Sequence, residues 1–351
     1  MKKEGLSKSL IVCICLMFLF PAGLILGDTI ASAKSKVVML KAIRPFAIDH
    51  RESYFYKELL DRVNERMKGR LQIKDMGGSE VYPVHEQIEA VKDGVIDYVI
   101  SPADYFAGVF PESLAVYLTF AAKPPELRKA GFIEALDGIC RQRNNVAIVA
   151  ACDYFQYNIY LKKPVKTAKD FKGRKIRVVA LYIPVIEGLG GSAVSIPFTE
   201  TYTALEKGVV DGFCWPATGA ADLGFHEQVS YQVYPYFWTS CSQLMFMNAK
   251  KLDTLPKDIK KDFLAIIMEL EKETYTLSQE FVKKELKVTR PAGLKPVTVT
   301  EKDWWKVQKL HWEGTLEKLR KIAPENTDKL EKIIVDAGWY PPKTMPEAPE
   351  M

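Results

Sequence analysis

One arginine stands out because it lies in a segment that the sequence predicts to be buried. Arg177 belongs to the run Lys175–Val179, whose pattern is typical of a short β-strand, and its neighbours Ile176 and Val178 are apolar. A guanidinium keeps its charge at physiological pH, so a buried one needs an anion beside it. That anion is either a carboxylate of the protein or one brought by a ligand, which a guanidinium can bind with two parallel hydrogen bonds. The residues alone leave both interpretations open.

Residue types that usually carry catalysis are not arranged for it. The sequence contains no GxSxG motif, and its histidines have neither HExxH nor HxH spacing. Gly188–Gly191 is rich in glycine, but it follows a predicted helix rather than a strand, so a dinucleotide-binding loop is not indicated. The histidines, which we expect to be surface or satisfied residues, are His50, His85, His226 and His311. The sequence therefore favours a binding protein over an enzyme and predicts no cofactor.

Arg177 is positioned by a predicted parallel α/β unit in residues 171–212. Its elements are strand Lys175–Val179, a helix from Pro184, strand Val194–Pro197, a helix with Thr199 as N-cap, and a strand from Val209. In such a unit the strand ends and the helix N-termini gather on one edge.

The first third of the chain has the same order of elements. We expect strands at Val37–Ile43, Leu71–Lys74 and Val95–Ser101, with helices at Ser53–Lys68 and Val84–Lys92 between them. A helix-like stretch at Pro125–Arg141, a strand at Val146–Ala151 and a strand at Gln243–Met247 follow. Two similar α/β lobes are the simplest account of this order.

The longest predicted helix runs from Pro256 to about Leu286 and keeps one apolar stripe throughout. At 1.5 Å per residue it is roughly 45 Å long, so it should bridge both lobes. Its spacing follows a period of 3.6 residues without a sustained heptad, which argues against a coiled coil. Thr300 is the predicted N-cap of the next helix, and a last helix is expected at Asp328–Ala337.

Several segments together resemble a known family. The segments are GRKIRV at 173–178, GLGGSAVSIPFTETYTALEKGVVDG at 188–212, GRL at 69–71, KDG at 92–94 and NAKKLDTLP at 248–256. They are similar, in the same order, to the solute-binding receptors of tripartite ATP-independent periplasmic (TRAP) transporters. The resemblance implies a two-lobed α/β fold of the periplasmic-binding-protein type (type II-like). It also implies that Arg177 binds the carboxylate of a small organic acid between the lobes.

The resemblance points to a second set of contacts in the crossing Cys152–Val165. Many family members place an arginine or another polar ligand residue there, whereas this chain offers Gln156, Tyr157 and Asn158. A second anchoring contact is therefore expected to be neutral, which disfavours a solute that needs two arginines.

Aromatic residues are the remaining candidates for contact with the solute. Tyr105 lies in a loop at the C-terminal end of a predicted parallel strand, where open α/β sheets bind ligands. Trp215 and Phe198 would add apolar area beside Arg177, although burial inside the second lobe is the alternative for Trp215. His50 also lies in a loop that faces the cleft in this architecture.

The stretch from Leu223 to Trp238 resembles the branch of the family that binds 2-oxo acids. Some members of that branch hold the acid through a metal ion. A glutamate next to the tryptophan would support such a metal here, but the residue is Cys214. We therefore predict no metal.

Four cysteines follow the N-terminal segment, namely Cys140, Cys152, Cys214 and Cys241. They permit three disulfide pairings in an exported protein, but they show no CxxC spacing. Buried thiols are the default expectation.

The N-terminus has the features of a targeting segment. It contains three lysines by position 8, an apolar run at Leu10–Leu26 and Ala31-Ser32-Ala33 as a cleavage signal. We therefore predict a cleaved signal peptide at 1–33 and a periplasmic protein, with an uncleaved membrane anchor as the alternative. The predicted lobes are 34–154 with 243–285 and 155–242 with 286–340, and the proline-rich tail 341–351 is expected to be disordered.

These features predict an extracytoplasmic receptor that delivers a carboxylate to the permease subunits of a TRAP-type membrane transporter. An exported sensor that binds a solute and touches a signalling partner is the alternative. A net charge of +5, with basic and acidic residues mixed, gives no nucleic-acid footprint. The sequence leaves the solute and the choice between monomer and homodimer open.

Overall fold

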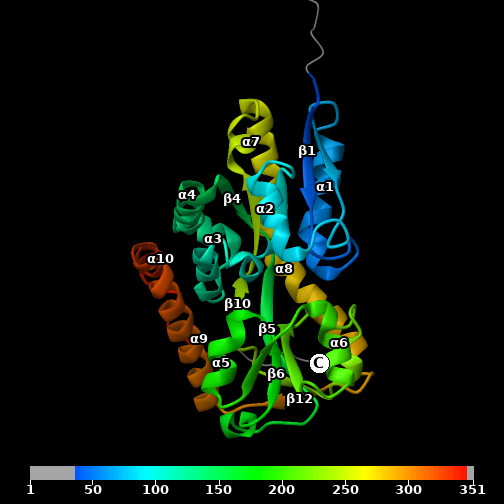
Figure 1. Cartoon of the computed structure of the whole chain (residues 1–351), viewed down its shortest axis with the longest axis vertical. Coiled ribbons are helices and arrows are strands. Elements are labelled where there is room, and N and C mark those ends of the chain that lie inside the picture. The colour runs from blue at the N-terminus through cyan, green and yellow to red at the C-terminus, as the bar shows by residue number, and fades with distance from the viewer. Residues whose placement is uncertain (1–35, 346–351) are drawn as a thin grey trace, which may run out of the picture. The chain divides into compact units, whose positions relative to one another are not determined.

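Two β-sheets organise the part of the chain that the structure describes, residues 36–345 of a computed structural model (Figure 1). The first sheet has the strand order β2-β1-β3-β11-β4. The second has the order β12-β9-β5-β8-β6-β7, with β10 paired to β5. Among the described residues, those from Val37 onward form one compact unit. The predicted signal peptide, 1–33, and the last six residues of the predicted tail lie outside the described residues.

The first sheet combines parallel strands with one antiparallel strand. β1 is parallel to β2 and to β3, whereas β11 is antiparallel to β3 and to β4. Its strands are β1 (Val38–Ile43), β2 (Leu71–Asp75), β3 (Tyr98–Pro102), β4 (Val146–Ala151) and β11 (Gln243–Asn248). The accompanying helices are α1 (Tyr54–Arg66), α2 (Gln87–Lys92), α3 (Pro124–Lys129), α4 (Phe132–Asn144) and α7 (Ala249–Asp253). Short 3₁₀ helices are η1 (Arg51–Ser53), η2 (Val84–Glu86), η3 (Ala103–Phe106) and η4 (Pro111–Leu118). The predicted β-α-β-α-β order is confirmed.

The second sheet contains the predicted parallel unit. β6 is parallel to both β7 and β8, and the long strand β5 is antiparallel to β8, β9 and β10. Its strands are β5 (Tyr154–Leu161), β6 (Lys175–Val178), β7 (Ser192–Ser195), β8 (Gly212–Pro216), β9 (Tyr231–Tyr234), β10 (Trp238–Cys241) and β12 (Lys295–Thr298). Its helices are α5 (Ile183–Gly188) and α6 (Thr201–Glu206), and α9 (Glu301–Ile322) and α10 (Pro324–Asp336) follow β12.

The long helix α8 (Lys257–Thr289) joins elements of the two sheets, as predicted. It packs against α1, α3 and β4 on one side and against β5 of the second sheet. Near its C-terminal end, the Glu285 carboxylate accepts hydrogen bonds from the backbone N–H groups of Gly219 (3.1 Å) and Ala221 (2.8 Å). The fold is therefore a two-lobed α/β fold with a bridging helix.

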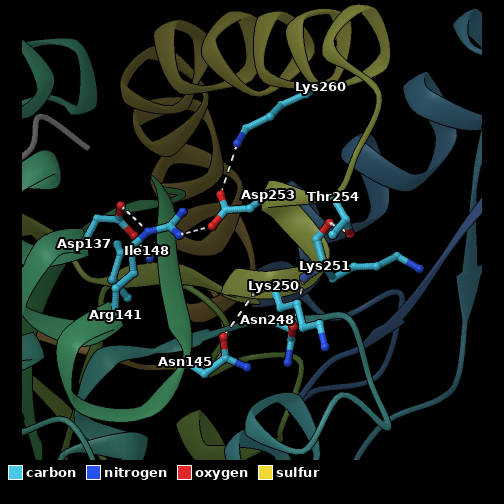
Figure 2. A network of polar contacts seen from close by, with 10 residues as sticks. All are labelled: Asp137, Arg141, Asn145, Ile148, Asn248, Lys250, Lys251, Asp253, Thr254 and Lys260. Atoms are coloured by element: carbon cyan, nitrogen blue, oxygen red, sulfur yellow. Dashed lines mark hydrogen bonds and ion pairs between the residues drawn. The ribbon is translucent and has the colours of Figure 1, made fainter.

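A polar network fixes the end of the first sheet where α4, β4, α7 and α8 meet (Figure 2). Asp137 accepts hydrogen bonds from Arg141 Nε (2.7 Å) and from the backbone N–H of Ile148 (2.8 Å). Arg141 also pairs with Asp253 at 2.8 Å, which in turn accepts from Lys260 on α8. These contacts stabilise the packing of the helices.

Two local predictions are wrong for identifiable reasons. The stretch Pro125–Arg141 forms two helices rather than one, because Gly131 between α3 and α4 has a φ of +74°, outside the helical region. Thr199 does not cap α6, because it lies inside a 3₁₀ turn (Phe198–Glu200), and Glu200 takes the N-cap position. Thr300 does cap α9, and its Oγ1 accepts from the Asp303 N–H at 3.2 Å.

The four cysteines are buried and free, as expected by default. The proposed lobe boundaries stay predictions. In particular, α10 packs against α4 and η4 although the sequence assigned its residues to the second lobe. Among residues 36–345, no helix is both long enough and apolar enough to cross a membrane.

Candidate functional site

Arg177 lies on β6 in the interior of the second sheet, between β7 and β8. Its strand neighbours Ile176 and Val178 are fully buried, and the arginine itself is 1% exposed. Its Nε donates to the backbone oxygen of Ile196 at 3.1 Å, while Nη1 has no hydrogen-bond partner among the described residues. The guanidinium carbon lies 5.6 Å from the ring centre of Trp215. The buried guanidinium thus retains an unused donor.

No aspartate or glutamate within residues 36–345 forms an ion pair with Arg177. Burial lowers the pKa of its guanidinium, and the electrostatic influence of Tyr105, Cys214 and Asp104 opposes that shift. A guanidinium is nevertheless so strongly basic that it stays charged at neutral pH. Asp104 is itself engaged, because its Oδ1 accepts the hydroxyl hydrogen of Tyr117. Within the described residues, Arg177 therefore forms no ion pair with a carboxylate of the protein. That internal pair was the first of the two alternatives that the sequence left open.

Two spaces meet at Arg177. One is a small cavity of about 30 Å³ and the other is a wider groove of about 530 Å³. The side chains that border both are Asp104, Tyr105, Arg177 and Val179. The remaining cavity wall is formed by Glu52, Pro102, Tyr117, Tyr157, Leu181, Tyr182, Cys214, Trp215 and Pro216. The guanidinium therefore lies where a ligand in the groove could reach into the protein interior.

The structure gathers most of the predicted contact residues around these spaces. Trp215 and Tyr157 line the cavity, Tyr105 lines both spaces, and Phe198 lines the groove. Gln156 and Asn158 are buried on β5, and neither borders the cavity or the groove.

Strand pairing nevertheless places Asn158 opposite Trp215, on the sheet face that also carries Arg177. The Asn158 side-chain nitrogen has no partner among the described residues. All these contact roles stay predictions.

Sequence reasoning missed Phe46, which connects the first sheet to this site. It lies in the loop after β1 and is 3% exposed. Its ring centre is 5.0 Å from that of Phe198 and 6.5 Å from that of Trp215. Both partners belong to the part of the chain that forms the second sheet. Phe46 is also stacked on His50, at 4.9 Å. Only its apolar type pointed to burial, because a loop has no periodicity that would reveal which face it presents.

Glu52 is the second residue that sequence reasoning missed. It lies in η1, is 5% exposed and forms part of the cavity wall with Arg177. Burial raises the pKa of its carboxyl to about 8, with further influence from Arg51, which lowers it, and from Asp153, which raises it. Glu52 stands among charged and polar residues at a predicted helix start, so the sequence gave no sign that its carboxyl would be buried.

Comparisons with known proteins identify the family of the chain. A family model named DctP, described as bacterial extracellular solute-binding protein, family 7, matches residues 49–313. The chain belongs to this family. The resemblance to TRAP receptors is thereby confirmed, and membership places the chain among solute-binding proteins rather than enzymes.

Among curated relatives, a monocarboxylate 2-oxoacid-binding periplasmic protein from Nostoc sp. is 26% identical over 217 residues. That alignment covers 59% of this chain and 59% of the Nostoc protein. The 2,3-diketo-L-gulonate-binding periplasmic protein YiaO from Escherichia coli is 24% identical over 69% of this chain and 75% of its own length.

Solved structures of TRAP periplasmic solute-binding proteins share the fold. A TRAP periplasmic solute-binding protein from Desulfovibrio salexigens with bound orotic acid has a TM-score of 0.75 at 22% identity, covering 85% of this chain and 98% of that chain. A second one, from Rhodoferax ferrireducens with bound malonate, has a TM-score of 0.73 at 19% identity, with the same two coverages.

Metal-ligating residues do not gather at the site of this family 7 member. Within the described ranges, no three His, Cys, Asp or Glu side chains form a group that could hold a metal ion. Cys214 lines the cavity next to Trp215, and burial raises the pKa of its thiol well above the usual value. The neutral thiol that results is a poor metal ligand.

Proposed function

We propose that this chain is a periplasmic receptor that binds the carboxylate of a small organic acid at Arg177 and delivers the acid to TRAP membrane subunits. The observation that carries the proposal is the buried guanidinium, which forms no ion pair in residues 36–345 and has an unused donor beside a groove. An unpaired buried cation is costly, and an incoming carboxylate removes that cost through charge-assisted hydrogen bonds.

The body of the acid would lie along the aromatic side chains that border the two spaces. Tyr105 and Phe198 line the groove, and Trp215 lies within 5.6 Å of the guanidinium carbon. The cavity alone, at about 30 Å³, is far smaller than the roughly 300–1,000 Å³ of ordinary ligand pockets. The solute would therefore enter from the groove, and the lobes would close around it.

Export by a cleaved segment at 1–33 is the further part of the proposal. It is supported by the basic start, the apolar run and the small residues at 31–33 of the sequence. Mass spectrometry of protein recovered from the periplasm tests it directly. A mature N-terminus near Lys34 is expected, whereas a retained N-terminus would favour a membrane anchor.

A thermal-shift panel of pyruvate, malonate, galacturonate and orotate, followed by calorimetry, tests the binding role. A ligand of the folded state alone raises the melting temperature. Arg177→Lys keeps the charge but loses the two-pronged geometry, so affinity should fall by about 10- to 150-fold, equivalent to ~1.5–3 kcal/mol. Arg66→Lys, on the surface of α1, is the matched control and should bind as the wild type does. Unchanged affinity in Arg177→Lys would contradict the proposal.

A further inference from the structure

Glu52 faces the same cavity as Arg177 and has one carboxyl oxygen in use. Its Oε2 accepts a hydrogen bond from Gln243 Nε2 at 3.3 Å, and the same amide donates to the Glu52 backbone oxygen at 2.9 Å. Its Oε1 is buried and has no partner anywhere in residues 36–345. Burying a polar atom without a partner is costly, so this oxygen is a candidate for contact with a ligand in the cavity.

The charges around Glu52 do not compensate an ionised carboxylate there. Arg51, the adjacent cation, donates to Asp153 at 3.3 Å, and its guanidinium carbon lies 4.1 Å from the ring centre of Phe281. Its charge is thus shared with a second buried acid. The charged and titratable groups that influence Glu52 or line the cavity wall with it are Arg51, Asp153, Asp104, Tyr105, Tyr117, Tyr157, Tyr182, Cys214 and Arg177.

These surroundings favour the neutral form of the carboxyl. Burial is the largest cause that raises the pKa of Glu52 to about 8, Asp153 and Asp104 raise it further, and Arg51 and Gln243 lower it. Below that pH the group carries a proton. Because Oε2 already accepts from Gln243, the proton belongs on Oε1, which then acts as a donor at the cavity wall.

We propose that Glu52 is a further solute-binding residue, whose neutral carboxyl donates a hydrogen bond from Oε1 to an oxygen of the acid held by Arg177. A carboxylate has about four acceptor positions, and a two-pronged arginine contact fills only two of them. A neutral donor elsewhere on the wall of the same cavity fills another without adding charge. This inference rests on the proposed function of Arg177.

The proposal makes solute binding depend on pH in one direction. When Glu52 ionises, it loses its donor and places a negative charge beside the bound carboxylate. Only the neutral fraction of the receptor then binds, and the apparent dissociation constant rises as that fraction falls. With a pKa of about 8, the dissociation constant should be about tenfold larger at pH 9 than at pH 7.

Calorimetric titration of the full chain between pH 7 and pH 9.5 tests this expectation, with pyruvate, malonate and galacturonate as probes. These acids are fully ionised throughout that range, so a change in affinity reports on the protein. Glu52→Gln keeps a neutral donor of the same shape and should bind with an affinity that no longer changes with pH. Glu52→Leu should bind about tenfold or more weakly at pH 7. Glu65→Gln, an exposed position on α1, should keep the wild-type pH profile.

Three results would overturn the proposal. They are a wild-type affinity that does not change up to pH 9.5, a pH dependence that survives in Glu52→Gln, and a requirement for added Na⁺ or Ca²⁺. A pH dependence of affinity that survives in Glu52→Gln would assign the titration to another group such as Asp104. A requirement for a cation would indicate that the Glu52 carboxylate is ionised when the solute binds. The proposed function fails separately, if no probe binds or if Arg177→Lys binds all of them normally. Thermal unfolding of each variant confirms that it is folded.

Discussion

Replacing Phe46 by alanine should weaken solute binding without touching Arg177. Phe46 comes from the loop after β1 of the first sheet, yet it packs in one cluster with Trp215 and Phe198 of the second half of the molecule. Its backbone oxygen is held by Arg44 Nη1 at 2.8 Å, which fixes the loop. The Phe46 side chain therefore connects an element of the first sheet with elements of the second. We expect this contact to stabilise the form in which the two lobes are closed around the solute.

The expected size of the effect follows from the pairs that alanine would lose. Each aromatic pair contributes ~0.5–1.5 kcal/mol beyond burial, and Phe46 makes two such pairs across to Phe198 and Trp215. Losing both should cost about 1–3 kcal/mol of closure free energy. If the solute binds the closed form, affinity falls by about 5- to 150-fold.

Phe225→Ala is the matched control for this change. Phe225 is 2% exposed and packs against Phe213 and Trp215. Both partners lie on β8 of the second sheet, so these contacts do not reach the first sheet. Both variants should lower the free energy of unfolding, typically by ~3–5 kcal/mol for a buried phenylalanine. Calorimetry should show the larger loss of affinity in Phe46→Ala. Equal losses of affinity, or a wild-type affinity in Phe46→Ala, would refute the closure argument.

Two further predictions concern stability. His311 is fully buried, stacked on Trp238 at 4.1 Å, and burial lowers its pKa to about 4, below the unfolded value of 6.5. Between these pH values the unfolded state therefore binds a proton that the folded state does not. The free energy of unfolding measured in urea should be about 2 kcal/mol lower at pH 5 than at pH 7. A His311→Gln variant with the same pH dependence would contradict this. An added Cβ at Gly212 on β8 would overlap the Tyr160 backbone oxygen, so Gly212→Ala should destabilise the protein by ~1–3 kcal/mol or more, whereas Gly108→Ala, with open space around it, should not. Equal unfolding midpoints for the two glycine variants would show that the strand spacing adapts.

The regular elements and the key arginine could be predicted because their signals are local. Alternating apolar residues around Arg177 and the long stripe on α8 carry their period in the sequence itself. The family motifs then predicted that Arg177 binds a carboxylate. The boundary errors arose where a backbone detail decided the outcome, as at Gly131, where a left-handed φ separates α3 from α4.

Phe46 and Glu52 could not be predicted because their roles depend on long-range packing. Both lie between β1 and α1, in a loop and a 3₁₀ turn without a repeating pattern. Their partners, Phe198, Trp215 and Gln243, are about 150 or more positions away in the chain, and only the fold brings them together. Gln156 and Asn158 illustrate the converse, since the sequence pointed to the crossing Cys152–Val165 but could not show which of its positions line the cavity.

A crystal structure of the protein with a probe acid that binds in the thermal-shift panel tests the central claim most directly. The carboxylate is expected to accept two hydrogen bonds from the Arg177 guanidinium, at the place where the groove meets the cavity. An acid bound elsewhere, with Arg177 paired instead to Asp104 or another carboxylate of the protein, would contradict it.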